Sequence, residues 1–496
     1  MHRATSEPVW ARWARWCLLA VLGASVAIGV GIAVQHLFYG WDNFSGESFN
    51  VFFAHRLATG HALYRSWDDR NLLFPIYQPG FFLALAPFSR FAGLALWPSR
   101  VISIAASVIA SYAAFRIARR LECSIFEALT SAFGMFAFGA TIMIASAGRP
   151  DMLAVTLGVV ALLAVTVWED QPRSGLAVAA AVVTGAMIMT KLNFAPLAAG
   201  LALAIWLRRR KTGLSFTLGV AAIVVIAFAV TQITSSGAFW QNTRDFSGVG
   251  YSLAALRGVV VSAVVPVPNP ILIVGAIETI FAISSGQTRA IHLNWLASMA
   301  VLASAAKLGS AGNYWLATTV ASSILLGPAL LRLRKASSRS VAAGVALFLS
   351  LSLCPQVFVF GADLRSEATM GLRRSVASAE AVRHIREAGG RPFINDADLA
   401  LHVGVQPSFE QHPFSVLANK GRWDPRTLAK AVEDRKFSVI ESSFDLRKDP
   451  IPTYQGIDVW PKVLVIAARR SYCLTWDEPL PSDIGNGFWL YEPCRD

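Results

Sequence analysis

The chain has 496 residues, of which 54% are hydrophobic and only 15% charged, and its mean hydropathy is positive. This composition excludes an ordinary soluble enzyme of this length and predicts an all-α polytopic membrane protein. The net charge of +13 does not predict a nucleic-acid partner, because the Arg and Lys residues lie in short runs between apolar segments and are not gathered on one basic domain.

Candidate membrane spans were located with a window of about 20 apolar residues, the length that crosses roughly 30 Å of hydrocarbon as a helix. They fall at about residues 16–38, 98–116, 124–147, 151–168, 175–190, 192–207, 213–235, 259–284, 291–308, 315–331 and 341–360. We therefore predict about 11 transmembrane helices. The first has the basic flank of a signal sequence, but its apolar run is too long, so we expect a retained anchor.

The orientation follows from the basic residues, which occupy alternate loops and include the runs "RRRK" at 208–211 and "RLRKASSR" at 332–339. All of them lie inside if the N-terminus is cytoplasmic, as the positive-inside rule expects. This topology requires the apolar segment 81–93, with about 13 residues, not to cross the membrane. We expect an interfacial or re-entrant helix there, and a first outer loop over about 39–97.

The composition changes after about residue 361, where charged residues, Pro and Trp become frequent and apolar spans end. We predict a transmembrane domain at 1–361 and a small α/β soluble domain on the outer side at 362–496. Its expected elements are a helix near 376–388, a strand at 391–395, a helix at 425–435 and a strand at 437–443. Cys473 and Cys494 both lie in this domain, where an oxidising periplasm permits a disulfide, but their spacing alone leaves the geometry open.

The first outer loop carries a candidate catalytic acid, Glu47. Apolar residues recur after it, among them Phe49, Phe52 and Phe53, and predict an amphipathic helix from about Ser45 to Gly60. Such a helix would hold the carboxylate at the water-facing mouth of a cavity between the spans. The alternative is that Glu47 is an ordinary N-terminal acid that interacts favourably with the helix dipole.

The motifs of this loop support a resemblance to a known family. The run Glu47, Ala54, Leu57, Gly60, Leu63 and Tyr64, followed by "PIYQPGFFLALAPF" and "WPSRVIS", resembles the first outer loop of GT-C superfamily glycosyltransferases. Three later segments are similar to the same proteins: "GRPDMLAVTLGVVALL" at 148–163, "TKLN" at 190–193 and "GSAGNYWL" at 309–316. The resemblance covers about 40–335. The chain departs from the family where the usual acidic pair begins with Gly46 and where a Pro-Pro pair is replaced by Pro79 and Gly80.

Members of this superfamily, which include protein mannosyltransferases and lipid A aminoarabinose transferases, move a sugar from a polyprenyl-phosphate carrier. The resemblance implies an inverting transfer to an acceptor hydroxyl, which needs a base for the hydroxyl proton and cations for the departing phosphate. Glu47 is the predicted base, and Asp42 is close enough in sequence to share or take that role. The predicted phosphate-binding residues are Lys191, Arg149, Arg244 and Arg56, and the predicted substrate-binding residues are Tyr77, Asp151, Asn313 and Tyr314.

Other interpretations of these residues stay open at the level of sequence. Lys191 could extend its ammonium group to the membrane interface. Arg149 and Asp151 could pair with each other or cap the following helix. Asn313 and Tyr314 could simply form a turn.

No cofactor is expected. The adjacent acids Asp68 and Asp69 suggest a divalent metal, which prefers carboxylate oxygens, but two neighbouring acids on a loop are more often solvated.

The expected partners are a polyprenyl-phosphate-linked sugar, membrane lipid and an acceptor that is a glycolipid, a polysaccharide or a protein. The expected location is a bacterial inner membrane, with a cytoplasmic N-terminus and a periplasmic C-terminal domain. A competing class is a flippase or transporter of lipid-linked sugars, since Glu278 lies within a span that Pro266, Pro268 and Pro270 interrupt. A third possibility is a protein with the GT-C fold that has lost activity, with Gly46 as the trace of that loss.

Overall fold

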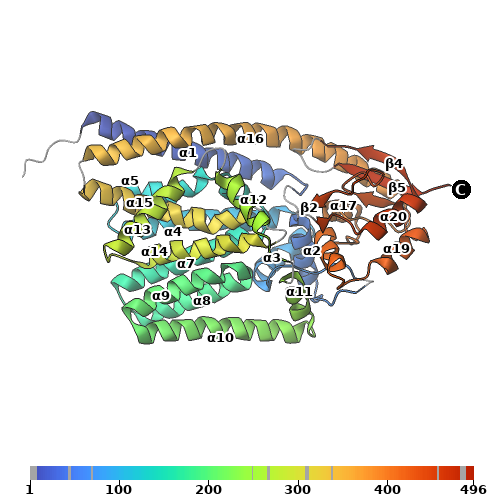
Figure 1. Ribbon diagram of the computed structural model, residues 1–496, viewed down its shortest axis with the longest axis horizontal. Coiled ribbons are helices and arrows are strands. Elements are labelled where there is room, and N and C mark those ends of the chain that lie inside the picture. Colours follow the sequence, from blue (N-terminus) through green and yellow to red (C-terminus); the bar gives the residue numbers. More distant parts are fainter. Residues whose placement is uncertain are drawn as a thin grey trace, which may run out of the picture.

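The structure is a computed structural model that describes residues 8–42, 46–68, 71–247, 250–264, 269–307, 312–336, 339–454, 457–480 and 487–495. Long helices lie side by side and form one elongated body, and the C-terminal elements cover one end of it (Figure 1). As predicted, the described chain is mostly helical and has a small sheet near its C-terminus.

The helical body contains both long and short helices. Its α-helices are α1 (Val9–Phe38), α2 (Glu47–Ala58), α3 (Pro79–Ala92), α4 (Trp97–Arg120), α5 (Ile125–Phe133), α6 (Gly139–Ala145), α7 (Pro150–Asp170), α8 (Ser174–Thr190), α9 (Ala195–Arg208), α10 (Arg210–Thr234), α11 (Ala238–Ser247), α12 (Leu253–Val264), α13 (Pro270–Ser284), α14 (Ala290–Ala303), α15 (Leu316–Ala336) and α16 (Arg339–Ala388). Short 3₁₀ helices are η1 (Gly134–Ala137), η2 (Leu192–Phe194), η3 (Ser304–Ala306) and η4 (Gly312–Trp315).

Six helices of the described chain are long and apolar enough to cross a membrane, and a seventh span is possible if one bent pair is counted. Four further apolar helices have only 10–17 residues, so each is shorter than the roughly 30 Å of hydrocarbon in a bilayer. The predicted membrane-protein class therefore has direct structural support, whereas the count of 11 spans stays a prediction.

Two predicted spans differ from the structure. The span expected at 124–147 is bent by 83° between η1 and α6, because Phe138 has an extended backbone (φ −122°, ψ 125°) that interrupts the helix. The span expected at 259–284 is divided into α12 and α13. A new helix starts at α13 because the Asn269 side chain accepts the N–H of Ile271 at 3.0 Å and Pro270 occupies the first helical position. Pro266 and Pro268 lie outside the described residues.

The two helices of the first outer loop form as the sequence predicts. Helix α2 begins after Gly46, which has a φ of 100°, and is followed by Gly60, which has a φ of 83°. The expected start at Ser45 lies outside the described residues. Helix α3 has 14 residues, is not among the candidate spans, and packs against α2 through an edge-to-face contact of Phe53 and Phe82 at 6.3 Å.

Helix α16 is continuous over 50 residues and runs beside α1 from the helical body into the C-terminal domain (Figure 1). The helix predicted near 376–388 is present, but these residues are the last turns of α16, which begins at Arg339. The predicted domain boundary at 361 falls inside this helix. The change in composition there does not end the helix.

The C-terminal domain packs helices against a small sheet. Its elements are α17 (Ala397–Val403), α18 (Gln411–Asn419), α19 (Arg426–Glu433), β1 (Ile440–Ser442), β2 (Thr453–Tyr454), β3 (Ile457–Asp458), α20 (Lys462–Ser471), β4 (Tyr472–Glu478) and β5 (Phe488–Pro493). Strands β1, β5 and β4 form an antiparallel sheet in that order, with Ile440 opposite Tyr491. A disulfide joins Cys473 to Cys494, so the predicted possibility is confirmed.

The strand expected at 391–395 is reduced to one isolated bridge between Phe393 and Ile440. The backbone N–H groups of Asn395 and Asp396 donate to the Glu441 carboxylate at 2.9 and 2.8 Å, which turns the chain away from the sheet.

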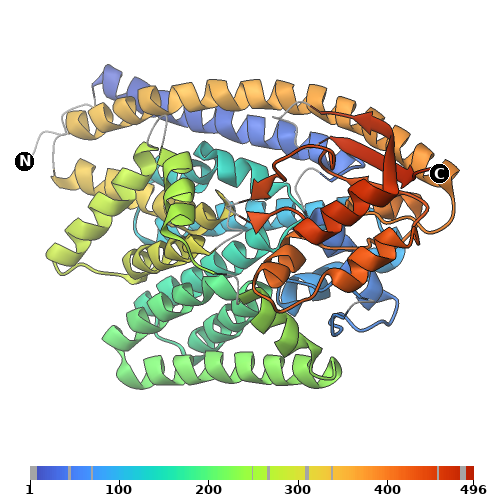
Figure 2. The ribbon, with the colours of Figure 1, turned by 45° about the vertical axis from the view of Figure 1, so that its right-hand side comes forward.

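The first outer loop is shared between the two parts of the molecule. Leu72 and Phe74 belong to the apolar core of the C-terminal domain, and Leu72 forms a parallel bridge with Phe409. The C-terminal domain also contacts α2 through α17 at the end of the helical body (Figure 2). The chain between α2 and α3 therefore lies between the apolar helices and the outer domain.

Candidate functional site

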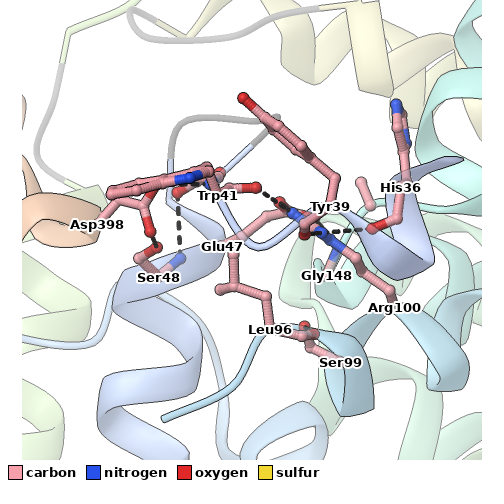
Figure 3. Close-up of polar contacts among 12 residues, drawn as sticks. His36, Tyr39, Trp41, Glu47, Ser48, Leu96, Ser99, Arg100, Gly148 and Asp398 are labelled. Atoms are coloured by element: carbon pink, nitrogen blue, oxygen red, sulfur yellow. Dashed lines mark hydrogen bonds and ion pairs between the residues drawn. The ribbon is translucent and has the colours of Figure 1, made fainter. Parts of the chain in front are cut away.

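Glu47 lies in the first turn of α2 and is wholly buried, with 0% of its surface exposed. Its Oε2 accepts Nη2 of Arg100 at 2.7 Å, and its Oε1 accepts Nε of Arg100 at 3.4 Å and the N–H of Gly148 (Figure 3). The expectation that this carboxylate faces a water-filled hollow is wrong. A carboxylate bonded to a guanidinium has a weakened affinity for protons, so the structure favours a structural role for Glu47.

Arg100 comes from the first turn of α4 and is also wholly buried. Its remaining guanidinium hydrogens donate to the backbone carbonyls of His36, Tyr39 and, at 2.6 Å, Trp41. Through these hydrogen bonds Arg100 links the end of α1 to Glu47 at the start of α2. A buried Arg in an apolar helix is costly unless it is paired in this way.

Gly148 is the point where this ion pair meets the rest of the site. A Cβ atom at this position would lie 2.2 Å from Oγ of Ser99, so the close approach requires glycine. The Asn50 side chain donates to the carbonyl of Gly148 at 3.1 Å, and the N–H of Gly148 donates to the Glu47 carboxylate. The peptide is therefore fixed on both sides, and Arg149 follows directly.

Arg149 connects two of the predicted substrate residues. Its Nη2 donates to the Tyr77 hydroxyl at 2.9 Å, and its Nε lies 3.6 Å from Oδ2 of Asp151. Asp151 is fully buried in the first turn of α7 and also pairs with Nζ of Lys191. The Asn313 amide donates to Oδ1 of Asp151 at 2.6 Å. Residues far apart in the sequence are thus brought together around one carboxylate.

Lys191 lies in an extended conformation between α8 and η2 and is 6% exposed. Its ammonium nitrogen is 5.8 Å from the ring centres of Tyr77 and Phe194 and 5.5 Å from that of Tyr314. Aromatic faces attract a cation at such distances. The alternative that Lys191 extends to the membrane interface does not fit, because the ammonium is enclosed by these rings and Asp151.

The segments "YQPG" and "TKLN" contact each other directly. Oε1 of Gln78 accepts the N–H of Leu192 at 2.9 Å. A Cβ atom at Gly80 would lie 2.6 Å from Oγ1 of Thr190, so only glycine allows α3 to approach the end of α8 this closely. The contact fixes the backbone on both sides of Lys191.

Asp42 is 6% exposed and serves as a cap for α2, because its Oδ2 accepts the N–H of Ser48 at 3.1 Å. Its own N–H donates to Oδ2 of Asp398 at 2.6 Å, and the Ser48 hydroxyl donates to Oδ1 of Asp398 at 3.2 Å (Figure 3). Burial, together with the negative charges of Glu47 and Asp398, raises the pKa of Asp42 well above its usual range.

The two other predicted phosphate ligands have different partners. Arg56 donates to the carbonyl of Ala62 at 3.3 Å and lies over the Phe52 ring. Arg244 is 55% exposed and pairs with Asp245 at 3.0 Å. Neither is brought to Asp151 by a contact of the described chain.

The metal hypothesis gains no support from the described residues. Asp68 accepts the N–H of Asn71 at 3.0 Å, and Asp69 lies outside the described part of the chain. No group of three or more His, Cys, Asp or Glu side chains in the described ranges could hold a metal ion.

Several charged groups near this cluster were missed at the level of sequence. The most informative are Lys307, which follows η3, and Glu410 and His412 of the outer domain. Burial and the nearby charge of Lys191 lower the pKa of Lys307 to about 8, whereas burial and the charge of Lys307 lower the pKa of His412 to about 4. Burial raises the pKa of Glu410 to about 8. No local pattern distinguishes these three from solvated residues.

The fold of this chain can be compared with those of known proteins. No protein-family model matches the sequence, and no curated protein matches it significantly. Solved structures do match, and this chain shares their fold over most of its length.

Two of these structures cover almost the whole chain. ArnT from Cupriavidus metallidurans bound to undecaprenyl phosphate superposes with a TM-score of 0.59 and 14% identity, covering 94% of this chain and 97% of that one. The archaeal oligosaccharyltransferase AglB from Archaeoglobus fulgidus, in complex with an inhibitory peptide and a dolichol-phosphate, superposes with a TM-score of 0.55 and 12% identity. That match covers 95% of this chain and 74% of AglB.

Proposed function

We propose that the protein is a membrane glycosyltransferase that moves a sugar from a polyprenyl-phosphate carrier to an acceptor hydroxyl on the periplasmic side, with inversion. The observation that carries the proposal is the buried cluster of Lys191 and Arg149 around Asp151, with Tyr77 and Asn313. It lies in a fold whose solved examples were determined with undecaprenyl phosphate and dolichol-phosphate.

The charge of the cluster suits a phosphate. Lys191 and Arg149 both contact the carboxylate of Asp151, so two cations gather at this point. A phosphate oxygen placed beside them would form charge-assisted hydrogen bonds. Tyr77 and Tyr314 flank Lys191, and the buried Oδ1 of Asn313 has no hydrogen-bond partner among the described residues, so it could accept a sugar hydroxyl.

The transfer also needs a carboxylate base. Of the two acids expected in the first outer loop, Glu47 is engaged by Arg100 and is better explained as a positioning residue for Gly148 and Arg149. Asp42 has a raised pKa and is the better base of the two, although its Oδ2 already accepts the N–H of Ser48.

The proposed setting is a bacterial inner membrane with the N-terminus in the cytoplasm and the C-terminal domain in the periplasm. The membrane-length helices and the basic runs in alternate loops support this orientation. The identity of the sugar and of the acceptor, whether glycolipid, polysaccharide or protein, is left open by this proposal.

Binding of undecaprenyl phosphate tests the proposed site without knowledge of the sugar. We expect Lys191→Gln to weaken this binding at least tenfold, since it removes a buried charge that faces the phosphate. Lys335→Gln is the matched control, because Lys335 is 62% exposed and pairs with the exposed Glu122. Equal affinity of the Lys191 variant and the wild type, measured in detergent by native mass spectrometry, would refute the site.

The competing flippase or transporter was suggested by Glu278. In the structure Glu278 is buried but ion-paired with Arg332 at 2.8 Å, and Nε2 of His292 lies 3.7 Å away, so its charge is explained within the helical body. Movement of a labelled carrier across proteoliposomes without sugar transfer would favour that class.

The inactive alternative is suggested by Gly46, where an added Cβ would meet nothing within 4 Å. The φ of Gly46 is 100°, which residues with a side chain rarely adopt, so the backbone itself favours glycine here.

A further inference from the structure

Glu410 joins the outer domain to the loop that carries Tyr77. It immediately precedes α18, and its N–H donates to the carbonyl of Leu72 at 3.1 Å. The neighbouring residue, Phe409, forms the parallel bridge with Leu72. Five residues after Leu72, the same segment reaches Tyr77, the hydrogen-bond partner of Arg149.

The charges around Glu410 are those of the proposed phosphate site. Burial raises the pKa of Tyr77, Arg149 opposes this effect, and the negative charges of Asp151 and Glu410 add to it. Glu410 is therefore close enough to act electrostatically on the Tyr77 phenol. Two residues further on, His412 is within electrostatic reach of Lys307, and Lys307 within reach of Lys191. The start of α18 thus borders the cluster from the outer side.

The carboxyl group of Glu410 has an unused acceptor. Its Oε2 is buried and has no hydrogen-bond partner among the described residues. A buried polar atom without a partner is costly, and in native proteins it calls for an explanation such as a ligand or a catalytic role. A carboxyl group that takes up a proton near neutral pH is also matched to general base catalysis, and burial raises the pKa of Glu410 to about 8.

The other carboxylates near Arg149 are each committed to a strong partner. Glu47 is bonded to Arg100, and Asp151 is bonded to Lys191. Asp42 accepts the N–H of Ser48 and so caps α2. Arg100 and Lys191 stabilise the charged forms of Glu47 and Asp151 and weaken both groups as bases. Asp42 has a raised pKa and is therefore the competing base, which the test below compares with Glu410.

We propose that Glu410 of the outer domain, and not an acid of the first outer loop, is the base that takes the proton of the acceptor hydroxyl. This inference rests on the proposed function. The acceptor O–H proton moves to the Glu410 carboxylate as the acceptor oxygen forms its bond to the anomeric carbon. The bond from the anomeric carbon to the phosphate oxygen breaks, and its electron pair leaves with the phosphate, which Lys191 and Arg149 stabilise.

This assignment places the acceptor between the outer domain and the helical body. The donor phosphate then binds on the side of Lys191, and the acceptor hydroxyl binds on the side of α18. The outer domain therefore contributes directly to the reaction, and the chain compensates for the missing acid at Gly46 with a group from a distant segment.

The test compares Glu410→Gln, Asp42→Asn and the control Glu433→Gln, an exposed glutamate of the same domain, for sugar transfer from polyprenyl-phosphate sugars extracted from the native membrane. We expect Glu410→Gln to lose 10²- to 10⁴-fold in kcat, the usual contribution of a general base, with undecaprenyl phosphate binding unchanged. The rate of the wild type should rise with pH to a plateau above about 8. In Glu410→Asp this midpoint should move while some activity remains.

Several outcomes would overturn the assignment. Full activity of Glu410→Gln excludes Glu410 as the base. The assignment is also excluded if Asp42→Asn abolishes the midpoint of the pH–rate profile while Glu410→Asp leaves that midpoint unchanged. Loss of phosphate binding in Glu410→Gln would show that the residue acts on the structure of the site and not on the proton. Absence of transfer by the wild type would overturn the proposed function itself, whereas the other results concern Glu410 alone.

Discussion

Replacement of Arg100 by methionine would separate the two roles that Glu47 could have. The substitution removes the guanidinium partner of the buried Glu47 carboxylate, which keeps the N–H of Gly148, and the carbonyls of His36, Tyr39 and Trp41 lose their guanidinium donor. Removal of one partner of a buried ion pair typically costs about 3–5 kcal/mol. Each lost hydrogen bond to a charged donor adds about 1.5–3 kcal/mol if no water replaces it.

The size of the effect follows from burial, because both side chains are 0% exposed and water cannot solvate the charge that remains. Arg100→Met should therefore be strongly destabilised. The double variant Arg100→Met/Glu47→Met should recover part of the loss, since it removes the orphaned carboxylate as well. Thermal unfolding of the detergent-purified protein measures this difference.

The control is Arg383→Met, whose ion pair with Glu387 joins side chains that are 56% and 57% exposed. Exposed pairs contribute about 0–1 kcal/mol, so its melting temperature should stay near that of the wild type. The reasoning is refuted if Arg100→Met unfolds no earlier than this control. If Glu47→Gln keeps the wild-type melting temperature and phosphate binding but loses transfer, Glu47 is the base after all.

Three further predictions concern other parts of the chain. Gly148→Ala should weaken undecaprenyl phosphate binding, because the new Cβ would lie 2.2 Å from Oγ of Ser99 and must displace the peptide that leads to Arg149; unchanged binding would contradict this. Replacement of Cys473 and Cys494 by serine should destabilise the outer domain by about 3 kcal/mol, since their disulfide closes a loop with a sequence separation of 21, and faster limited proteolysis would reveal it. Because the folded state retains the proton of Glu410 up to about pH 8, stability should fall as pH rises from about 4.3 to 8, and Glu410→Gln should reduce this fall in a melting curve series. If the melting temperature of this variant depends on pH as that of the wild type does, the raised pKa of Glu410 is contradicted.

Much of the framework follows from local patterns. Apolar runs predict the membrane helices, Gly60 correctly predicts the end of α2, and the apolar segment 81–93 lies largely within α3. Two segments that carry the resemblance also meet in the structure, because Asp151 in the first turn of α7 pairs with Lys191, which follows α8.

The parts that the sequence does not reveal depend on pairing across long distances. Arg100 and Glu47 are 53 positions apart, and neither residue's neighbours indicate the partner, so Glu47 was interpreted as facing water. Glu410 reaches the first outer loop from a domain that follows all the membrane helices, and no periodicity predicts that contact. The length of α16 was missed for a different reason. The amino-acid composition changes from apolar to charged near the middle of α16, but the helix continues through this change.

The 50 residues of α16 correspond to a rod of about 75 Å, far longer than the thickness of a bilayer. Its far end carries the outer domain, so a swing of that domain away from the membrane would break consecutive backbone hydrogen bonds. For the glycosyltransferase proposed here, we therefore expect substrates to enter by local rearrangement of the connecting loops, while the uninterrupted α16 keeps the C-terminal domain at a fixed distance from the helical body.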